Sequence, residues 1–372
     1  MLNKVGHLNS LAGEPGAWNR SGVDAQPQNV LKDLASDREG MQIDERLTFL
    51  NEMQLPAVIT AIHGEPLVEL LAARREPLAA ILRHYGAILF RGFGLRTAEE
   101  FQAAAAECFG DVLRPYVGGI SPRAKVTAGV YESTRFPNYL RIPQHNEMSY
   151  LPDSPRTLAF FCEVAPGNGG ETPLADSRIV YERIPADIRE RFEQAGIRYS
   201  RYLYGPRWNP LNRLFNLISE LHTSWMEAFA TGDRAVVERV CADQGGSVHW
   251  DWEQGARITN DLPPARLHPQ TGEKVWFNQA ASFLATPQST GLPRWLLYTA
   301  AHPFPHRRPF HATLANGDPI SHSQVSRINA AIESATVRFP WQRGDFLLVD
   351  NYLVSHGRMP FKGDRRILVA MR

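Results

Sequence analysis

The residues with the clearest chemical potential are a histidine and a glutamate two positions apart, His145 and Glu147. In a strand, residues i and i+2 point to the same face, so a His-x-Glu pair can present two metal ligands at once. Two neutral imidazoles and one carboxylate on one side of an Fe(II) ion leave three positions open for a keto acid and O2. The spacing would suit such a site, provided that a second histidine comes from a different strand.

The His-x-acid pattern is weak by itself. The chain has 12 histidines and 39 acidic residues among 372, so about one match is expected by chance. Three matches occur: His63/Glu65, His145/Glu147 and His249/Asp251. The first precedes the strand-rich region, and the third lies among tryptophans where packing explains it, although spacing does not exclude it. The best candidate for the distant ligand is His356, which follows the apolar strand pattern of residues 345–350.

Strand-type and helix-type segments surround these residues. Apolar runs typical of buried strands lie at residues 86–91, 157–164, 273–279, 346–350 and 367–370. Helical spacing occurs at residues 66–85, with a break expected at Pro77, and at residues 184–192 and 325–332. A further helix is expected to begin at a capping box of Thr97 and Glu100 and to end at Gly110. Short strands between turns, with helices at one end and inserted, favour a sheet-on-sheet β architecture.

Six segments resemble, in order, the taurine/α-ketoglutarate dioxygenase (TauD/TfdA) superfamily. They are GAILFRGFGL (86–95), QHNEMSY (144–150), GGETPLADSR (169–178), HPQTGEKVWFNQ (268–279), WQRGDFLLVDNYLVSHGR (341–358) and RRILVAM (365–371). Within this superfamily the chain is most similar to the clavaminate synthase-like branch, which includes the syringomycin-type amino-acid β-hydroxylases. The resemblance implies a mainly β fold with helices: a double-stranded β-helix (jelly roll) core with helical insertions.

The resemblance also implies the residues that hold Fe(II) and the cosubstrate 2-oxoglutarate. The metal ligands would be His145, Glu147 and His356, with Glu147 in place of the aspartate usual in taurine dioxygenase. Thr172 falls where the family places a hydroxyl on 2-oxoglutarate. Arg366 falls where the family anchors the distal carboxylate, a role that suits a guanidinium fork, and Arg365 is the competing choice.

Two departures from the family pattern narrow the chemistry. Taurine dioxygenase carries a second arginine four residues after the anchoring one, where this chain has Ala370, which argues against a sulfonate or phosphonate substrate. Related halogenases replace the carboxylate ligand by a small residue. Because Glu147 is present, hydroxylation or desaturation is favoured over halogenation.

The resemblance thus implies an Fe(II)- and 2-oxoglutarate-dependent dioxygenase that consumes O2. It would hydroxylate an aliphatic carbon of an amino acid or amino-acid-derived intermediate of natural-product biosynthesis, either free or tethered to a carrier protein. Arg141, Asn278 and Arg358 are the candidate substrate-binding residues. The alternatives are a desaturase or cyclase on the same scaffold, and a non-catalytic metal-binding jelly-roll protein. A structural metal site would be expected to add a fourth Cys or His, and none lies near either motif.

Composition limits the partners. With 40 basic and 39 acidic residues and no basic block, neither nucleic acid nor an anionic membrane is indicated. No apolar run approaches the roughly 20 residues that span a bilayer, and the N-terminus lacks the apolar run of a signal peptide. The three cysteines, Cys108, Cys162 and Cys241, cannot all pair within one chain, so we expect a reducing cytoplasm. The sequence permits a homo-oligomer but does not require one.

The chain is expected to divide into an arm and one domain. Residues 1–40 are rich in Gly, Asn, Asp, Pro and Ser, which predicts a loosely ordered N-terminal arm. Residues 41–372 would form a single oxygenase domain with a helical insertion at about 205–255. This insertion and the irregular stretch 116–144 are candidates for a lid.

Overall fold

The computed structural model describes residues 46–372, apart from residues 63, 111–124, 134–135, 208–209, 211–212 and 214–221. Residues 46–372 form one compact unit. The expected arm at residues 1–40, His63 and parts of both candidate lid segments therefore lie outside the described residues.

Two sheets that contribute to the main apolar core carry the candidate site. The larger has eight strands in the order β1 (Leu47–Phe49), β2 (Ala57–Thr60), β3 (Ala87–Arg91), β17 (Phe346–Asp350), β7 (Thr157–Val164), β20 (Arg366–Met371), β5 (Val130–Glu132) and β4 (Lys125–Thr127). The smaller has four, in the order β16 (Thr336–Val337), β9 (Leu174–Asp176), β18 (Val354–Arg358) and β6 (Ile142–His145). In the larger sheet β2 and β3 are parallel, and the other neighbours in both sheets are antiparallel.

Apolar side chains from both sheets meet in one core. Leu347 and Val349 of β17 belong to the same buried cluster as Leu174 of β9 and Val354 of β18. Their spacing by two along β17 is the alternation expected of a strand with one face on this core. The packing of the two sheets confirms the predicted mainly β fold with a jelly-roll core and inserted helices.

Helices lie around the two sheets. They are α2 (Leu67–Ala73), α3 (Arg75–Tyr85), α4 (Ala98–Phe109), α5 (Ser177–Arg183), α6 (Ala186–Ala195), α10 (Pro287–Thr290), α11 (Leu292–Ala301), α12 (His322–Ser334) and the 3-10 turn η2 (Pro305–Arg307). The capping box of Thr97 and Glu100 is present at the start of α4, as predicted. The break expected at Pro77 falls instead at Arg74, because proline is tolerated in the first turn of α3, where its missing N–H has no partner to lose. No described helix is both long and apolar enough to cross a membrane.

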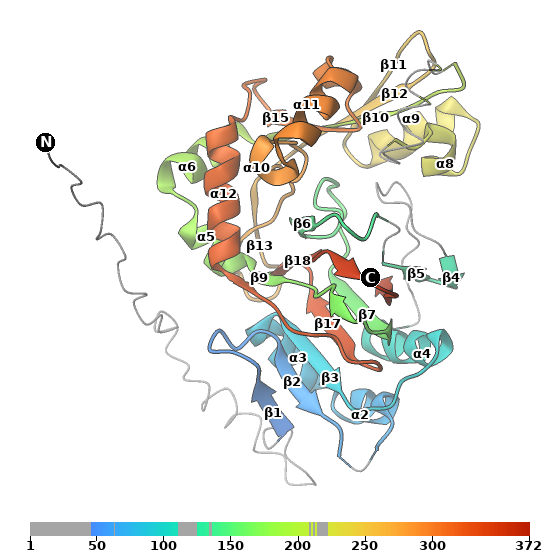
Figure 1. Cartoon of the computed structure of the whole chain (residues 1–372), viewed down its shortest axis with the longest axis vertical. Coiled ribbons are helices and arrows are strands. Elements are labelled where there is room, and N and C mark those ends of the chain that lie inside the picture. The colour runs from blue at the N-terminus through green and yellow to red at the C-terminus, as the bar shows by residue number, and fades with distance from the viewer. Residues whose placement is uncertain are drawn as a thin grey trace, which may run out of the picture. The chain divides into compact units, whose positions relative to one another are not determined.

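A second four-stranded sheet follows the order β11 (Ser247–Trp250), β12 (Ala256–Leu262), β10 (Ile197–Leu203) and β15 (Phe310–Leu314). Helices α8 (Trp225–Phe229) and α9 (Arg234–Asp243) share a separate apolar cluster with it. The insertion at 205–255 is therefore only partly helical: its end forms β11, because Val248 and Trp250 alternate onto that cluster. Figure 1 shows β6, β9 and β18 between this sheet and strands β1–β3. Two short pairs complete the strands: β13 (Ala265–Leu267) with β14 (Lys274–Trp276), and β8 (Asn168–Gly169) with β19 (Phe361–Lys362).

A buried histidine, His222, and a half-buried one, His302, lie beside this sheet and predict a pH-dependent stability. Burial, aided by His302, lowers the pKa of His222 to about 3, and burial, aided by Arg308, lowers the pKa of His302 to about 4. Below pH 6.5 the unfolded chain binds protons that the folded chain does not, so the free energy of unfolding falls as the pH falls. For His222 alone the loss by pH 5 is at most about 2 kcal/mol. The Tm is expected to decrease from pH 8 to pH 5, above the range in which carboxylates titrate. The decrease should be smaller in His222→Phe, and an equal decrease in both proteins would contradict the assignment.

Candidate metal centre

Three side chains that the sequence nominates as ligands converge on one point. His145 ends β6, His356 lies in β18, and these strands pair so that the two residues are opposite each other. Their ring centroids are 4.5 Å apart. One ligand atom from each of His145, Glu147 and His356 lies within 4.8 Å of the others, and Glu147 Oε2 is 3.8 Å from His356 Nε2. This is the one group of three or more such side chains within the described part of the chain.

Glu147 reaches this group by a different route from the one predicted. Strand β6 ends at His145, and Glu147 lies in the following turn, where Met148 has a φ of 52°. The main chain of Glu147 is held by Asn351, whose Oδ1 accepts from Glu147 N at 2.6 Å. Strand alternation therefore does not align the His-x-Glu pair. A turn aligns it, together with a contact from a residue far along the chain.

The chemistry of the three side chains suits Fe(II). His145 Nδ1 lies 2.8 Å from the carbonyl oxygen of Pro143. Because a carbonyl only accepts, Nδ1 carries the proton of the neutral ring and Nε2 presents its lone pair. Glu147 and His356 are 4% and 5% exposed, and His145 is half-buried. Two imidazoles and one carboxylate are the donor set of iron centres that keep positions open for cosubstrate and O2.

A pocket opens beside the two histidines. Its lining consists of Ser133, Ile142, His145, Phe160, Thr172, His356, Gly357, Arg358, Arg365 and Ile367. Thr172 is buried, and its Oγ1 accepts a hydrogen bond from Trp341 Nε1 at 3.0 Å. Because the indole N–H can only donate, the proton of the Thr172 hydroxyl remains available to a ligand in the pocket.

Two adjacent arginines, Arg365 just before β20 and Arg366 at its first position, differ in their contacts with this pocket. Arg365 lines the pocket, and its Nε donates to Gly170 O at 2.9 Å. Arg366 does not line it: its guanidinium pairs with Glu163 and, at 3.6 Å, with Glu132. The lining of the pocket thus favours Arg365, the competing choice, over Arg366 as the anchor of the distal carboxylate. Arg365 lines the pocket together with Ile367, two positions further along, whereas Arg366 is engaged by the two glutamates.

The pocket carries positive charge. Burial, followed by repulsion from Arg358, lowers the pKa of Arg365 to about 10, and burial lowers the pKa of Arg358 to about 10. Both guanidiniums therefore remain protonated at neutral pH. Neither guanidinium forms an ion pair with an acidic residue of the described ranges. The guanidinium carbon of Arg365 lies over the Phe361 ring, 5.6 Å from its centroid. A buried charge without an ion-pair partner favours an anionic ligand.

Residues 54–372 match the family described as "Taurine catabolism dioxygenase TauD, TfdA family". The chain belongs to this family. It is 32% identical over 306 residues to a clavaminate synthase-like protein of Arabidopsis thaliana, covering 81% of this chain and 86% of that protein. It is 34% identical over 296 residues to the dapdiamide synthesis protein DdaC of Enterobacter agglomerans, and this match covers 80% of this chain and 84% of that protein.

A solved structure of PvcB, an Fe, alpha-ketoglutarate dependent oxygenase from an isonitrile synthetic pathway, aligns with a TM-score of 0.47 at 16% identity, covering 85% of this chain and 84% of that one. Membership of the TauD/TfdA family makes the chain an Fe(II)- and 2-oxoglutarate-dependent dioxygenase, an oxidoreductase that uses O2. This confirms the family, the enzyme class and the cofactors expected from the sequence.

In this TauD/TfdA dioxygenase the three candidate substrate-binding residues contact other parts of the protein. Arg358 lines the pocket, but its terminal nitrogens donate to the carbonyl oxygens of Phe136, Pro137 and Leu140. Arg141 forms a surface ion pair with Glu333 at 2.8 Å, with both side chains more than 40% exposed. Asn278 donates to Pro264 O at 2.8 Å and accepts from Ala280 N at 3.1 Å. Only Arg358 of the three is thus brought to the metal group.

The competing His-x-Asp pattern serves the fold of this TauD/TfdA enzyme. His249 lies in β11, and Asp251 accepts from Tyr202 Oη at 2.7 Å and pairs with Arg307 at 3.0 Å. Sequence reasoning also missed two residues that contact the site, Asn351 and Trp341. Both lie in the segment 341–358 that carries the family resemblance. An asparagine or a tryptophan does not by its residue type indicate a role in the site, because the role depends on the partner, Glu147 for Asn351 and Thr172 for Trp341.

Proposed function

We propose that this TauD/TfdA dioxygenase hydroxylates an aliphatic carbon of an amino acid or amino-acid-derived compound, either free or tethered to a carrier protein. His145, Glu147 and His356 would hold the iron, and Thr172 and Arg365 the 2-oxoglutarate. The observation that carries the proposal is one pocket that contains both histidines, the buried hydroxyl of Thr172 and the half-buried guanidinium of Arg365. Likeness to a dapdiamide synthesis protein supports a substrate from a natural-product pathway.

Bound iron would couple the decarboxylation of 2-oxoglutarate to oxidation of the substrate. The protein binds and orients the reactants. Arg365 offers its fork to the distal carboxylate, and Thr172, oriented by Trp341, donates a hydrogen bond to the cosubstrate. The apolar side chains of Ile142, Phe160 and Ile367 exclude water from the same pocket.

We also propose a reducing, cytoplasmic location. Cys108, Cys162 and Cys241 are all free thiols. Burial raises the pKa of Cys108 and of Cys162 to about 12, so both remain protonated and unreactive. These thiols therefore support the location without a catalytic part.

The proposal is tested by product mass. Purified enzyme with Fe(II), 2-oxoglutarate and O2 is screened against amino acids, both free and as carrier thioesters, while succinate release is followed. We expect substrate-dependent succinate and a product heavier by one oxygen. A product lighter by two hydrogens would instead support the desaturase or cyclase. If folded wild-type protein turns over 2-oxoglutarate no faster than Glu147→Ala does, the catalytic function is contradicted.

A further inference from the structure

A buried asparagine links the turn between β17 and β18 to the glutamate of the metal group. Asn351 is 0% exposed. Its Oδ1 accepts from Glu147 N at 2.6 Å, and its Nδ2 donates to Glu147 O at 3.0 Å and to Pro155 O at 2.7 Å. A carboxamide can make this set because it has both an acceptor and donors. Both main-chain polar groups of Glu147 are thus paired by one side chain.

The main chain of the same asparagine adds further contacts. Asn351 O accepts from Asn146 Nδ2 at 2.7 Å, and Asn351 N donates to Arg156 O at 2.9 Å. Asn146 O accepts in turn from Gln279 Nε2 at 2.8 Å. The turn that carries Glu147 and the turn that leads from β17 into the strand of His356 are therefore joined directly, although Glu147 and Asn351 are 204 positions apart.

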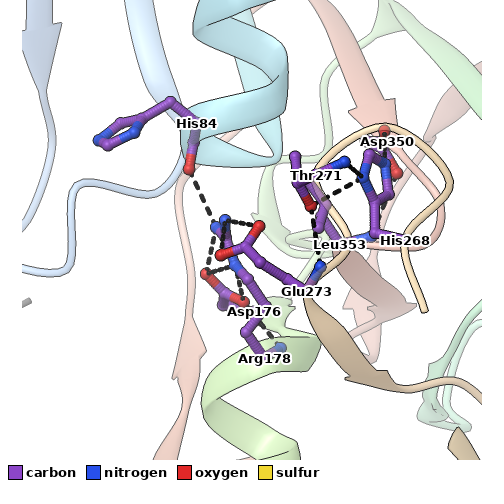
Figure 2. A network of polar contacts seen from close by, with 8 residues as sticks. All are labelled: His84, Asp176, Arg178, His268, Thr271, Glu273, Asp350 and Leu353. Carbon is purple, nitrogen blue, oxygen red and sulfur yellow. Dashed lines mark hydrogen bonds and ion pairs between the residues drawn. The ribbon is translucent and has the colours of Figure 1, made fainter. Parts of the chain in front are cut away.

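Asp350 fixes the shape of the turn that presents Asn351. Its Oδ1 accepts from Tyr352 N at 2.9 Å and Leu353 N at 3.2 Å. Its Oδ2 lies 3.0 Å from His268 Nε2, and Figure 2 shows Asp350 with Leu353 and His268. His268 Nδ1 accepts from Thr271 N at 3.0 Å, so the proton of the neutral ring is on Nε2 and points to Asp350. Each of these polar groups has a defined partner, which favours one rigid arrangement.

A second polar cluster anchors this support to two helices (Figure 2). Glu273 N donates to Thr271 Oγ1 at 3.4 Å, and the Glu273 carboxylate pairs with Arg178 of α5 at 3.1 Å. Arg178 also pairs with Asp176 at 2.7 Å and donates to the carbonyl oxygen of His84 in α3 at 3.0 Å. The loop between β13 and β14 is thereby held at both ends, by Asp350 at His268 and by Arg178 at Glu273.

We propose that Asn351 is a positioning residue of the metal centre that acts through Glu147. By pairing the N–H and C=O of Glu147, it sets the direction in which the Glu147 carboxylate leaves the main chain, toward His356 Nε2 at 3.8 Å. The inference rests on the proposed role of Glu147 as a metal ligand. Contacts that only stabilise the fold would not need to pair both polar groups of that one residue.

The test measures metal affinity without turnover. Mn(II) binding to the full-length protein is followed by the loss of the free-ion electron paramagnetic resonance signal. Asn351→Leu keeps the branched shape, adds no charge and removes all three side-chain hydrogen bonds. We expect its Mn(II) Kd to rise by about 10–100-fold, the effect typical of losing an outer partner of a metal ligand. Because Asn351 acts through Glu147, Glu147→Ala/Asn351→Leu should bind no more weakly than Glu147→Ala.

A matched control is Asn260→Leu, which removes another buried amide that donates to a main-chain carbonyl, in β12 of the other four-stranded sheet. Asn351→Ser, which leaves space for water, replaces the leucine variant if that protein does not fold. A wild-type Kd in folded Asn351 variants, an equal loss in Asn260→Leu, or additive losses in the double variant would each overturn the inference. Equal binding by wild type and Glu147→Ala would overturn the proposed metal site itself.

Discussion

Replacing His356 with alanine is expected to abolish the visible charge-transfer band that forms when Fe(II) and 2-oxoglutarate are added without oxygen. His356 is 5% exposed and lies opposite His145 across the β6–β18 pair, so no other described histidine can take its place. Fe(II) binding should weaken by more than about 100-fold, because the loss of an outer partner alone costs roughly 10–100-fold. The titration compares wild type with His356→Ala.

The control for this experiment is His249→Ala, which removes the histidine of the competing His-x-Asp pattern in β11. We expect a wild-type band from this variant. A band that survives in His356→Ala, or one that disappears in His249→Ala, would contradict the proposed ligand set. The absence of a band in folded wild-type protein would contradict the cosubstrate assignment as a whole.

Replacing Arg365 with alanine is expected to raise the KM for 2-oxoglutarate by about 100-fold or more, because removing one partner of a buried charge pair costs roughly 3–5 kcal/mol. Arg365 lines the metal pocket and has no ion-pair partner among the described acidic residues. Arg365→Lys keeps the charge but loses the planar fork, so its KM should lie between those of wild type and Arg365→Ala. Initial rates at varied 2-oxoglutarate provide the measurement.

The neighbouring arginine provides the matched control. Arg366 is 41% exposed and pairs with Glu163 and Glu132, and such exposed pairs contribute at most about 1 kcal/mol. Arg366→Ala should therefore leave the KM for 2-oxoglutarate nearly unchanged. The opposite pattern, a large increase in Arg366→Ala and none in Arg365→Ala, would restore the assignment carried over from the family.

Local signals in the sequence were sufficient to predict several helices and strands and to identify the three side chains of the metal group. The capping box at Thr97 marked the start of α4, and the apolar runs at 157–164 and 346–350 gave β7 and β17 with their observed bounds. Such signals are local because caps and side-chain alternation act within a few residues. The residue types and order of His145, Glu147 and His356 identified the three side chains that converge.

Other features were decided only by contacts between distant segments. Residues 367–370 are apolar at four successive positions, so no alternation in the sequence indicated which of Arg365 and Arg366 faces the pocket. Arg141 was turned outward by Glu333, which comes from α12. Glu147 was held by Asn351 rather than by its own strand. In each case the partner lies more than 190 positions away or on another strand, and local periodicity carries no information about such partners.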